Sequence, residues 1–176
     1  MARLEGKVAL VTGAAHERGI GRGIVRALAE EGSRVAVVDI AHEEMGEELA
    51  QEVGEPNLGI LFDTWHLWDT PDVLDHIRRE AHRFVPGIHI DDWREPTRGW
   101  TDRALPGEGA MDLPALFGAL DAGGWDGWCD MEFFSDDGSI DVDYPDSLWR
   151  AHSYEELIRR GRDGFERAWA ERKVPA

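Results

Sequence analysis

The sequence predicts an α/β fold in which one five-stranded parallel sheet has flanking helices. Two observations support this prediction: short β-branched or apolar runs alternate with amphipathic segments, and a loop containing glycine or aspartate follows each run. Strands that alternate with helices form right-handed β-α-β units, and such units build parallel sheets. The length of 176 residues suits one compact domain with a sizeable core.

Residues 1–54 predict a β-α-β-α segment. Its strands are rich in β-branched residues, and its first helix has apolar residues at helical spacing and stops at Gly32. The expected elements are a strand at 7–12, a helix at 20–31, a strand at 34–39 and an acidic amphipathic helix at 43–53.

Residues 55–176 add three further strand–helix units. Thr70 is expected to cap the first of their helices with Pro71 in its first turn, and Asp112 is expected to cap the second. A long polar loop is expected between residues 91 and 109. The strands are predicted at 58–63, 85–90 and 128–133, and the helices at 70–81, 112–120 and 153–172.

These elements fit a three-layer, flavodoxin/Rossmann-like sandwich with strand order 2-1-3-4-5. In that order the first β-α-β unit pairs strands 1 and 2, the later strands pair in chain order, and no connection is knotted. The alternative is an open partial barrel that oligomerises to cover its free edge. Both arrangements bring the carboxyl ends of the strands to one rim.

Composition excludes several classes of partner. The formal net charge is -17, of which the first 54 residues contribute -4 and the rest -13, so neither nucleic acid nor an anionic membrane surface is expected to bind. The single cysteine, Cys129, cannot form an internal disulfide and fits a reducing cytoplasm. No stretch approaches the ~20 apolar residues that span a bilayer.

The loop at residues 12–21 lies between the first strand and the first helix. Its glycines let the backbone approach a pyrophosphate at the helix N-terminus, and Asp39 ends the next strand, where a carboxylate accepts hydrogen bonds from a ribose. With Leu4-Glu5-Gly6-Lys7-Val8-Ala9 ahead of it, this pattern over residues 3–54 resembles the short-chain dehydrogenase/reductase family. The resemblance implies that NAD, rather than NADP, would contact Gly13, Gly19, Ile20, Gly21 and Asp39.

The catalytic pair of that family, a tyrosine with a lysine four residues later, has no counterpart here. The residues at that spacing after Tyr144 and Tyr154 are Leu148 and Ile158. The only lysines are Lys7 and Lys173. Without a neighbouring cation to lower a phenol pKa from ~10, the usual proton transfer has no agent at neutral pH. We therefore expect no dehydrogenase activity, and a role of the glycine loop in packing alone is an equal alternative to dinucleotide binding.

Three metal-ligating residue types stand at or near the carboxyl ends of predicted strands: Asp63, His89 and Glu132. In a parallel sheet these ends share one rim, so the three side chains are expected to converge. Two carboxylates and one imidazole suit Mg²⁺, Mn²⁺ or Zn²⁺ and leave coordination positions open. An aspartate after a strand also suits a simple cap of the next segment.

Four separated motifs extend this observation: Asp63-Thr64-Trp65-His66, His89-Ile90-Asp91-Asp92-Trp93-Arg94, Leu105-Pro106-Gly107-Glu108-Gly109 and Asp130-Met131-Glu132-Phe133. In this order, over residues 57–172, they resemble the last three β-α units of the sugar-phosphate isomerase/epimerase family, whose members are xylose-isomerase-like TIM barrels. The resemblance implies that Asp63, His89 and Glu132 bind the metal, that His66 and Arg94 contact substrate hydroxyl or phosphate groups, and that Glu132 also transfers protons.

The second acid/base glutamate of that family lies on an earlier strand that has no counterpart here. The sequence therefore predicts a metal-dependent sugar or sugar-phosphate isomerase/epimerase-like protein with impaired activity, acting on a small molecule and able to form a homo-oligomer. Two alternatives remain: an NAD-binding dehydrogenase-like fragment, and an inactive fusion or engineered chimera joined near residues 53–57.

Overall fold

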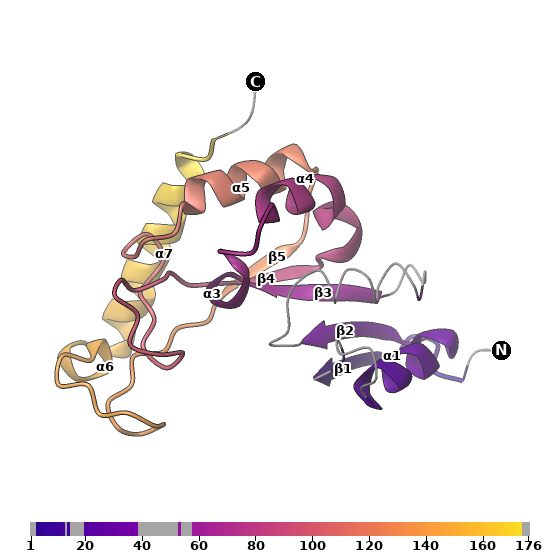
Figure 1. The fold of residues 1–176 in the computed structure, drawn as a ribbon, viewed down its shortest axis with the longest axis horizontal. Coiled ribbons are helices and arrows are strands. Elements are labelled where there is room, and N and C mark those ends of the chain that lie inside the picture. The colour runs from indigo at the N-terminus through magenta and orange to yellow at the C-terminus, as the bar shows by residue number, and fades with distance from the viewer. Residues whose placement is uncertain (1–2, 13, 15–19, 39–52, 54–57, 174–176) are drawn as a thin grey trace.

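A computed structural model describes residues 3–12, 14, 20–38, 53 and 58–173. Five strands form one parallel sheet in the order β1-β2-β3-β4-β5, so the predicted five-stranded parallel sheet is confirmed (Figure 1). The strands are β1 (Val8–Thr12), β2 (Arg34–Val38), β3 (Leu58–Asp63), β4 (Gly87–Ile90) and β5 (Trp128–Met131).

The predicted strand order 2-1-3-4-5 is wrong. Each strand pairs with the next along the chain, as in a barrel wall. When every crossover is right-handed and each new strand joins the same growing edge, all the connecting helices fall on one face of the sheet. The three-layer sandwich is therefore not formed by the described elements, and the chain-order arrangement of the alternative, an open partial barrel, is the one observed.

The helices α1, α4 and α5 contribute to the apolar clusters on one face of the sheet. Val35, Val37 and Ile60 belong to one apolar cluster together with residues of α1, and Phe62 and Ile88 belong to a second cluster together with residues of α4 and α5. The helices are α1 (Ile20–Glu30), α3 (Thr64–Leu67), α4 (Val73–Phe84), α5 (Leu113–Ala122), α6 (Leu148–Ala151) and α7 (Tyr154–Ala170).

The opposite face of the sheet is partly open. On β1, Val8 and Leu10 are 66% and 64% exposed, and on β5 Trp128 is 49% exposed. The register aligns Leu61 with Gly87 and Gly87 with Trp128 on this face, where a Cβ on Gly87 would overlap the indole of Trp128. The uncovered face is the one that would line the interior of a closed barrel.

Several element boundaries differ from those expected. β4 begins at Gly87 rather than Val85 because Pro86 has no N–H to give to a neighbouring strand. α4 begins at Val73, and its N-cap is Asp72 rather than the expected Thr70. Asp72 adopts a left-handed backbone conformation. The expected helix at 43–53 lies outside the described residues except for its last position.

The C-terminal helix α7 runs unbroken through two glycines, Gly161 and Gly164, although glycine ordinarily weakens a helix interior. A Cβ on Gly161 would overlap the Met131 sulfur, and one on Gly164 would overlap the carbonyl of Pro106. These glycines let α7 approach β5 and the loop before α5. None of the helices in the described ranges is both long and apolar enough to cross a membrane.

Candidate metal centre

Asp63, His89 and Glu132 converge at the carboxyl end of the sheet. Asp63 ends β3, and the strand register places His89 of β4 directly beside it, while Glu132 follows β5. One potential ligand atom from each lies within 4.8 Å of the others. His89 Nδ1 is 3.9 Å from Asp63 Oδ2 and 3.6 Å from Glu132 Oε2. This donor set, two carboxylates and one imidazole, fits a divalent metal ion.

Local structure fixes the orientation of Asp63. Its Oδ1 accepts a hydrogen bond of 2.9 Å from the backbone N–H of Trp65, so Asp63 also caps the short helix α3. The capping role that the sequence suggested and a ligand role are thus compatible, because Oδ2 still faces His89. Burial acts to raise the pKa of Asp63, but His89 and the Arg103 guanidinium outweigh it and hold that pKa below its usual range.

The two carboxylates change the protonation of His89. Asp63 and Glu132 together raise the pKa of the His89 imidazole to about 10, although partial burial opposes them. In the metal-free protein His89 is therefore an imidazolium at neutral pH, and a metal ion must displace its proton to use the ring nitrogen.

Arg103 is the residue of this centre that the sequence did not reveal. Its side chain is 2% exposed, and Nη1 lies 3.3 Å from Asp63 Oδ2 and 3.0 Å from Glu132 Oε2. Nη1 also donates to Asp91, which is completely buried. The guanidinium sits near the Trp65 and Phe134 rings, 5.2 and 5.0 Å from their centroids. A fixed cation therefore stands beside the candidate metal ligands.

Asp91 is a buried hydrogen-bond partner that fixes the position of Arg103. Its carboxylate accepts a 2.6 Å hydrogen bond from the Thr64 hydroxyl, whose oxygen in turn accepts from the Asp91 backbone N–H at 3.0 Å. Burial raises the pKa of Asp91 to about 7, although the charge of Arg103 opposes the shift. Asp91 is thus a support for Arg103 rather than only the cap of a following segment.

Aromatic side chains form one wall beside the centre. The Trp65 ring stacks on Trp93, with centroids 4.8 Å apart, and meets the ring of His66 edge to face. His66 Nε2 is 4.0 Å from Asp63 Oδ2, so the structure brings this predicted site residue to the centre. The indole N–H groups of Trp65 and Trp68 are buried without a hydrogen-bond partner among the described residues.

Arg94 has different surroundings from those expected. Its Nε is 2.9 Å from the carboxylate of Asp102, which is fully buried and also accepts a 2.7 Å hydrogen bond from Arg98 Nε. The contacts found for Arg94 thus join it to the loop that carries Arg103, and none of them reaches the three candidate ligands in the described structure. Its proposed contact with substrate stays a prediction.

The predicted dinucleotide contacts fall largely beyond what the structure describes. Ile20 and Gly21 open α1, whereas Gly13, Gly19 and Asp39 lie outside the described residues. Neither tyrosine is placed beside a lysine: Tyr144 donates to the Arg98 carbonyl, and Lys173 pairs with Asp112. NAD binding therefore stays untested, and no Tyr–Lys pair forms in the described part.

Comparison with known proteins agrees with this geometry. Residues 9–168 match the xylose isomerase-like TIM barrel family. The chain belongs to that family. The fold agrees as well: the crystal structure of the IOLI protein with a binding zinc atom superposes with a TM-score of 0.67 at 20% identity, covering 96% of this chain and 65% of that one.

Curated relatives come from two classes of enzyme. The inosose isomerase of Bacillus velezensis is 29% identical over 94 residues, which cover 52% of this chain and 34% of that protein. The 3-beta-hydroxysteroid dehydrogenase of Comamonas testosteroni is 48% identical over 77 residues, 44% of this chain and 29% of that protein. The chain therefore spans about a third of the length of these relatives. The match to the barrel family, by contrast, extends over most of this chain.

Proposed function

We propose that this protein binds one divalent metal ion through Asp63, His89 and Glu132 and acts on a small sugar or sugar phosphate as an isomerase or epimerase. The observation that carries the proposal is the convergence of these three side chains at one sheet rim, with ligand atoms within 4.8 Å of one another. Relatives named as an inosose isomerase and a 2-oxo-tetronate isomerase support the substrate class, because both names denote polyhydroxylated carbonyl compounds.

Each neighbouring group has a place in this chemistry. A bound divalent ion would polarise a carbonyl oxygen and its neighbouring hydroxyl. In this proposal Glu132, near the rim surface, takes a proton from the carbon that bears that hydroxyl. Arg103 offers charge-assisted donors to a substrate oxygen beside the ligands, and the Trp65–Trp93 stack offers a flat apolar wall to the sugar ring.

We propose further that proton transfer is impaired. Moving a proton to the other face of one carbon needs two acid/base groups on opposite sides of the substrate, whereas transfer between neighbouring carbons along one face can use a single group. The other carboxylates of the centre have structural partners: Asp63 caps α3, and Asp91 holds Thr64 and Arg103. Glu132 also contacts Arg103 and His89, but it is more exposed than Asp63 and Asp91, and we assign proton transfer to it. Exchange at one face should therefore exceed epimerisation at that carbon.

Deuterium exchange tests this function directly. The Mn²⁺-loaded protein is incubated in D₂O with inososes, ketoses and their phosphates, and NMR follows both exchange at carbon and product formation. We expect slow exchange with at least one compound, with little product, and loss of exchange in Glu132→Gln. Glu108→Gln serves as the matched control, because Glu108 pairs with Arg160 on the protein surface. Exchange no faster than with Mn²⁺ alone, or unchanged in Glu132→Gln, would reject the proposal.

A further inference from the structure

A second cavity opens at the amino end of the sheet, away from the candidate metal centre. The first half of β3 pairs only with β2, through Leu58 to Ile60, whereas its second half pairs only with β4, through Leu61 to Asp63. Before Leu61, β3 forms no ladder with the chain that leads into β4, because Pro86 has no N–H to donate. The Pro86 ring fills part of the gap, since a Cβ on Gly59 would lie 2.6 Å from Pro86 Cδ.

This gap is large enough for a small molecule. The cavity has a volume of about 650 Å³, within the range of ordinary ligand pockets. Most of its wall is apolar and comes from strands β1 to β5 and the segments that enter them. The residues of this apolar wall are Val8, Val35, Leu58, Val85, Pro86 and Trp128. The indole of Trp128, half-exposed over Gly87, gives the wall one flat aromatic surface.

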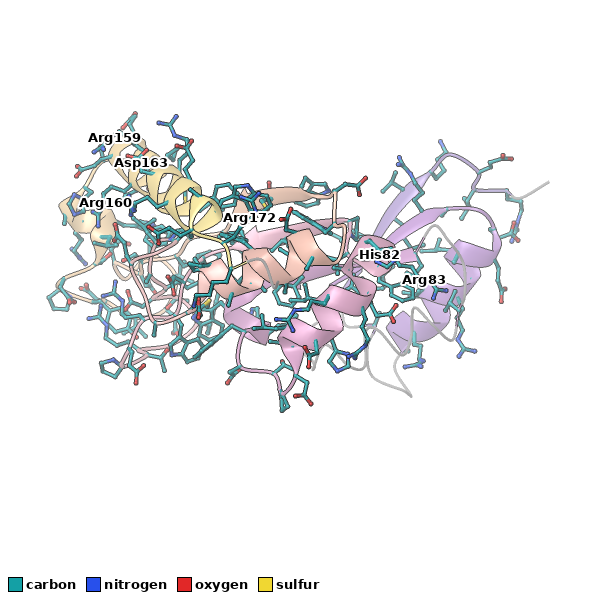
Figure 2. All side chains as sticks on the ribbon, turned by 90° about the horizontal axis from the view of Figure 1, so that it is seen from above. His82, Arg83, Arg159, Arg160, Asp163 and Arg172 are labelled. Atoms are coloured by element: carbon teal, nitrogen blue, oxygen red, sulfur yellow. The ribbon has the colours of Figure 1, made fainter. Side chains whose placement is uncertain are left out.

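The polar part of the lining is predominantly basic. Arg34 from β2 and His82 and Arg83 from the end of α4 line the cavity, against the single carboxylate of Asp126. Figure 2 shows His82 and Arg83 together at one end of α4, far from the arginines labelled on α7. The guanidinium of Arg83 lies 4.6 Å from the centroid of the Phe84 ring, which holds it at the rim.

Several other cations among the described residues have acidic partners. Arg160 pairs with Glu108, and Arg172 pairs with Asp121. By contrast, the side chains of Arg34, His82 and Arg83 form no hydrogen bond or ion pair in the part of the chain that the structure describes. In a protein with a formal charge of -17, a cavity with two unpaired guanidinium groups is a local positive exception.

We propose that this cavity is a second ligand site, for a small organic anion with a flat apolar body, such as an aryl or short alkyl phosphate or carboxylate. The two guanidinium groups would bind the anionic group, for which their donor geometry is suited. Trp128 and the aliphatic wall would contact the apolar body. The site is independent of the proposed isomerase chemistry, because it lies at the opposite ends of the same strands.

Phenyl phosphate is a suitable probe, with inorganic phosphate and phenol as its two halves. Isothermal calorimetry on the full chain should show saturable one-site binding of phenyl phosphate, at least tenfold tighter than either half. The double variant Arg34→Gln/Arg83→Gln should weaken that binding at least tenfold, as should Trp128→Ala, whereas Arg159→Gln/Arg162→Gln, on the exposed side of α7, should not. Circular dichroism and thermal unfolding verify that each variant is folded.

Two further results decide the assignment. Glu132→Gln and Asp63→Asn should retain parental affinity for phenyl phosphate, which separates this cavity from the metal centre. Binding should also weaken as ionic strength rises, since the contact is between charges near the surface. The proposal is overturned if no saturable binding is found, if the Arg34/Arg83 variant binds as well as the parent, or if inorganic phosphate binds as tightly as phenyl phosphate.

Discussion

Two regions of this protein, the rim at the carboxyl ends of the strands and the amino-terminal β1-α1-β2 unit, are stabilised in different ways. At the carboxyl end, buried carboxylates organise the loops: Asp92 accepts backbone N–H groups from Trp93, Gly107, Gly109 and Met111. In the amino-terminal β1-α1-β2 unit, apolar packing on one face dominates, and the other face of β1 is exposed. The carboxyl-end rim is therefore held by polar contacts between loops, and the amino-terminal unit by a small apolar core.

The loops of the rim are ordered by buried carboxylates that accept several backbone hydrogen bonds. Asp136 repeats the arrangement of Asp92, with N–H groups of Gly138, Ile140, Asp141 and Val142 around one carboxylate. Buried carboxylates that accept several backbone donors replace the hydrogen bonds that helices or strands would supply. The rim is thus ordered without regular secondary structure, and changes there should cost more than changes in the amino-terminal unit.

The largest effect should come from removing the buried arginine. Arg103→Met leaves Asp91 buried without its counter-ion, and we expect a loss of about 3 kcal/mol in the free energy of unfolding, measured by urea titration at pH 8. The loss should be smaller at pH 5, because the orphaned carboxyl can take up a proton. Arg162→Met, with a side chain 65% exposed, should change stability by no more than about 0.5 kcal/mol. Equal losses in the two variants would remove the contrast between rim and surface.

The next prediction concerns the pH dependence of the metal-free rim. The pKa of His89 is raised to about 10, above the ~6.5 of an unfolded chain, so the folded state binds the proton more tightly. Its stabilising contribution is complete below pH ~6.5 and is lost as pH rises towards 10. Unfolding free energies measured from pH 6 to 10 should therefore fall more steeply in the parent than in His89→Gln. Parallel curves would mean that the carboxylates do not hold the imidazolium.

The same shift changes the expected behaviour of metal binding. An unperturbed imidazole, with a pKa of ~6.5, would lose its ligand lone pair only below about pH 6. With the pKa of His89 at about 10, Mn²⁺ affinity should instead rise steadily between pH 6 and pH 9. An affinity that levels off above pH 7 would contradict the raised pKa.

A smaller effect sharpens the description of the amino-terminal unit. Val25 is fully buried between α1 and the sheet, so Val25→Ala should cost about 2 kcal/mol, measured by urea unfolding. Val8 belongs to the same unit but is exposed, so Val8→Ala should cost less than about 0.5 kcal/mol. A large loss for Val8→Ala would show that the open face of β1 is covered in solution.

The last prediction in this order is that no NAD- or NADP-linked oxidation of alcohols occurs. Addition of NAD or NADP with a panel of secondary alcohols should give no turnover, because neither tyrosine has a lysine beside it in the described structure. Absorbance at 340 nm measures this directly. Steady turnover that Asp39→Ala abolishes would restore the dehydrogenase interpretation.

The sequence predicted the strands and their carboxyl-end residues well, for a physical reason. Three apolar runs have Asp63, His89 or Glu132 at or near their carboxyl ends, so each run predicts a strand and also a polar residue at the rim. The strand register then brings these side chains together. Strand order could not be predicted in the same way, because it depends on which edge each crossover reaches. Local apolar pattern is the same in a sandwich and in a barrel wall.

Arg103 was missed because nothing local marks it as buried. It precedes the Leu105-Pro106-Gly107-Glu108-Gly109 motif, which did signal a functional loop, but an arginine in a polar loop is ordinarily exposed. Its burial depends on Asp91, Asp63 and Glu132, which come from three separate strands. The family resemblance indicates Arg94 instead, and the structure pairs it with Asp102.

The central claim is that three strand ends form one divalent-metal site, and calorimetric titration with Mn²⁺ tests it most directly. The parent is compared at pH 8 with Asp63→Ala, His89→Ala, Glu132→Ala and His152→Ala. His152 is the matched control because its ring contacts Glu156, on the first turn of α7. We predict one site in the parent, an affinity lower by on the order of 100-fold in each of the first three variants, and parental affinity in the fourth. Equal affinity in all five proteins would contradict the claim and remove the basis of the isomerase proposal.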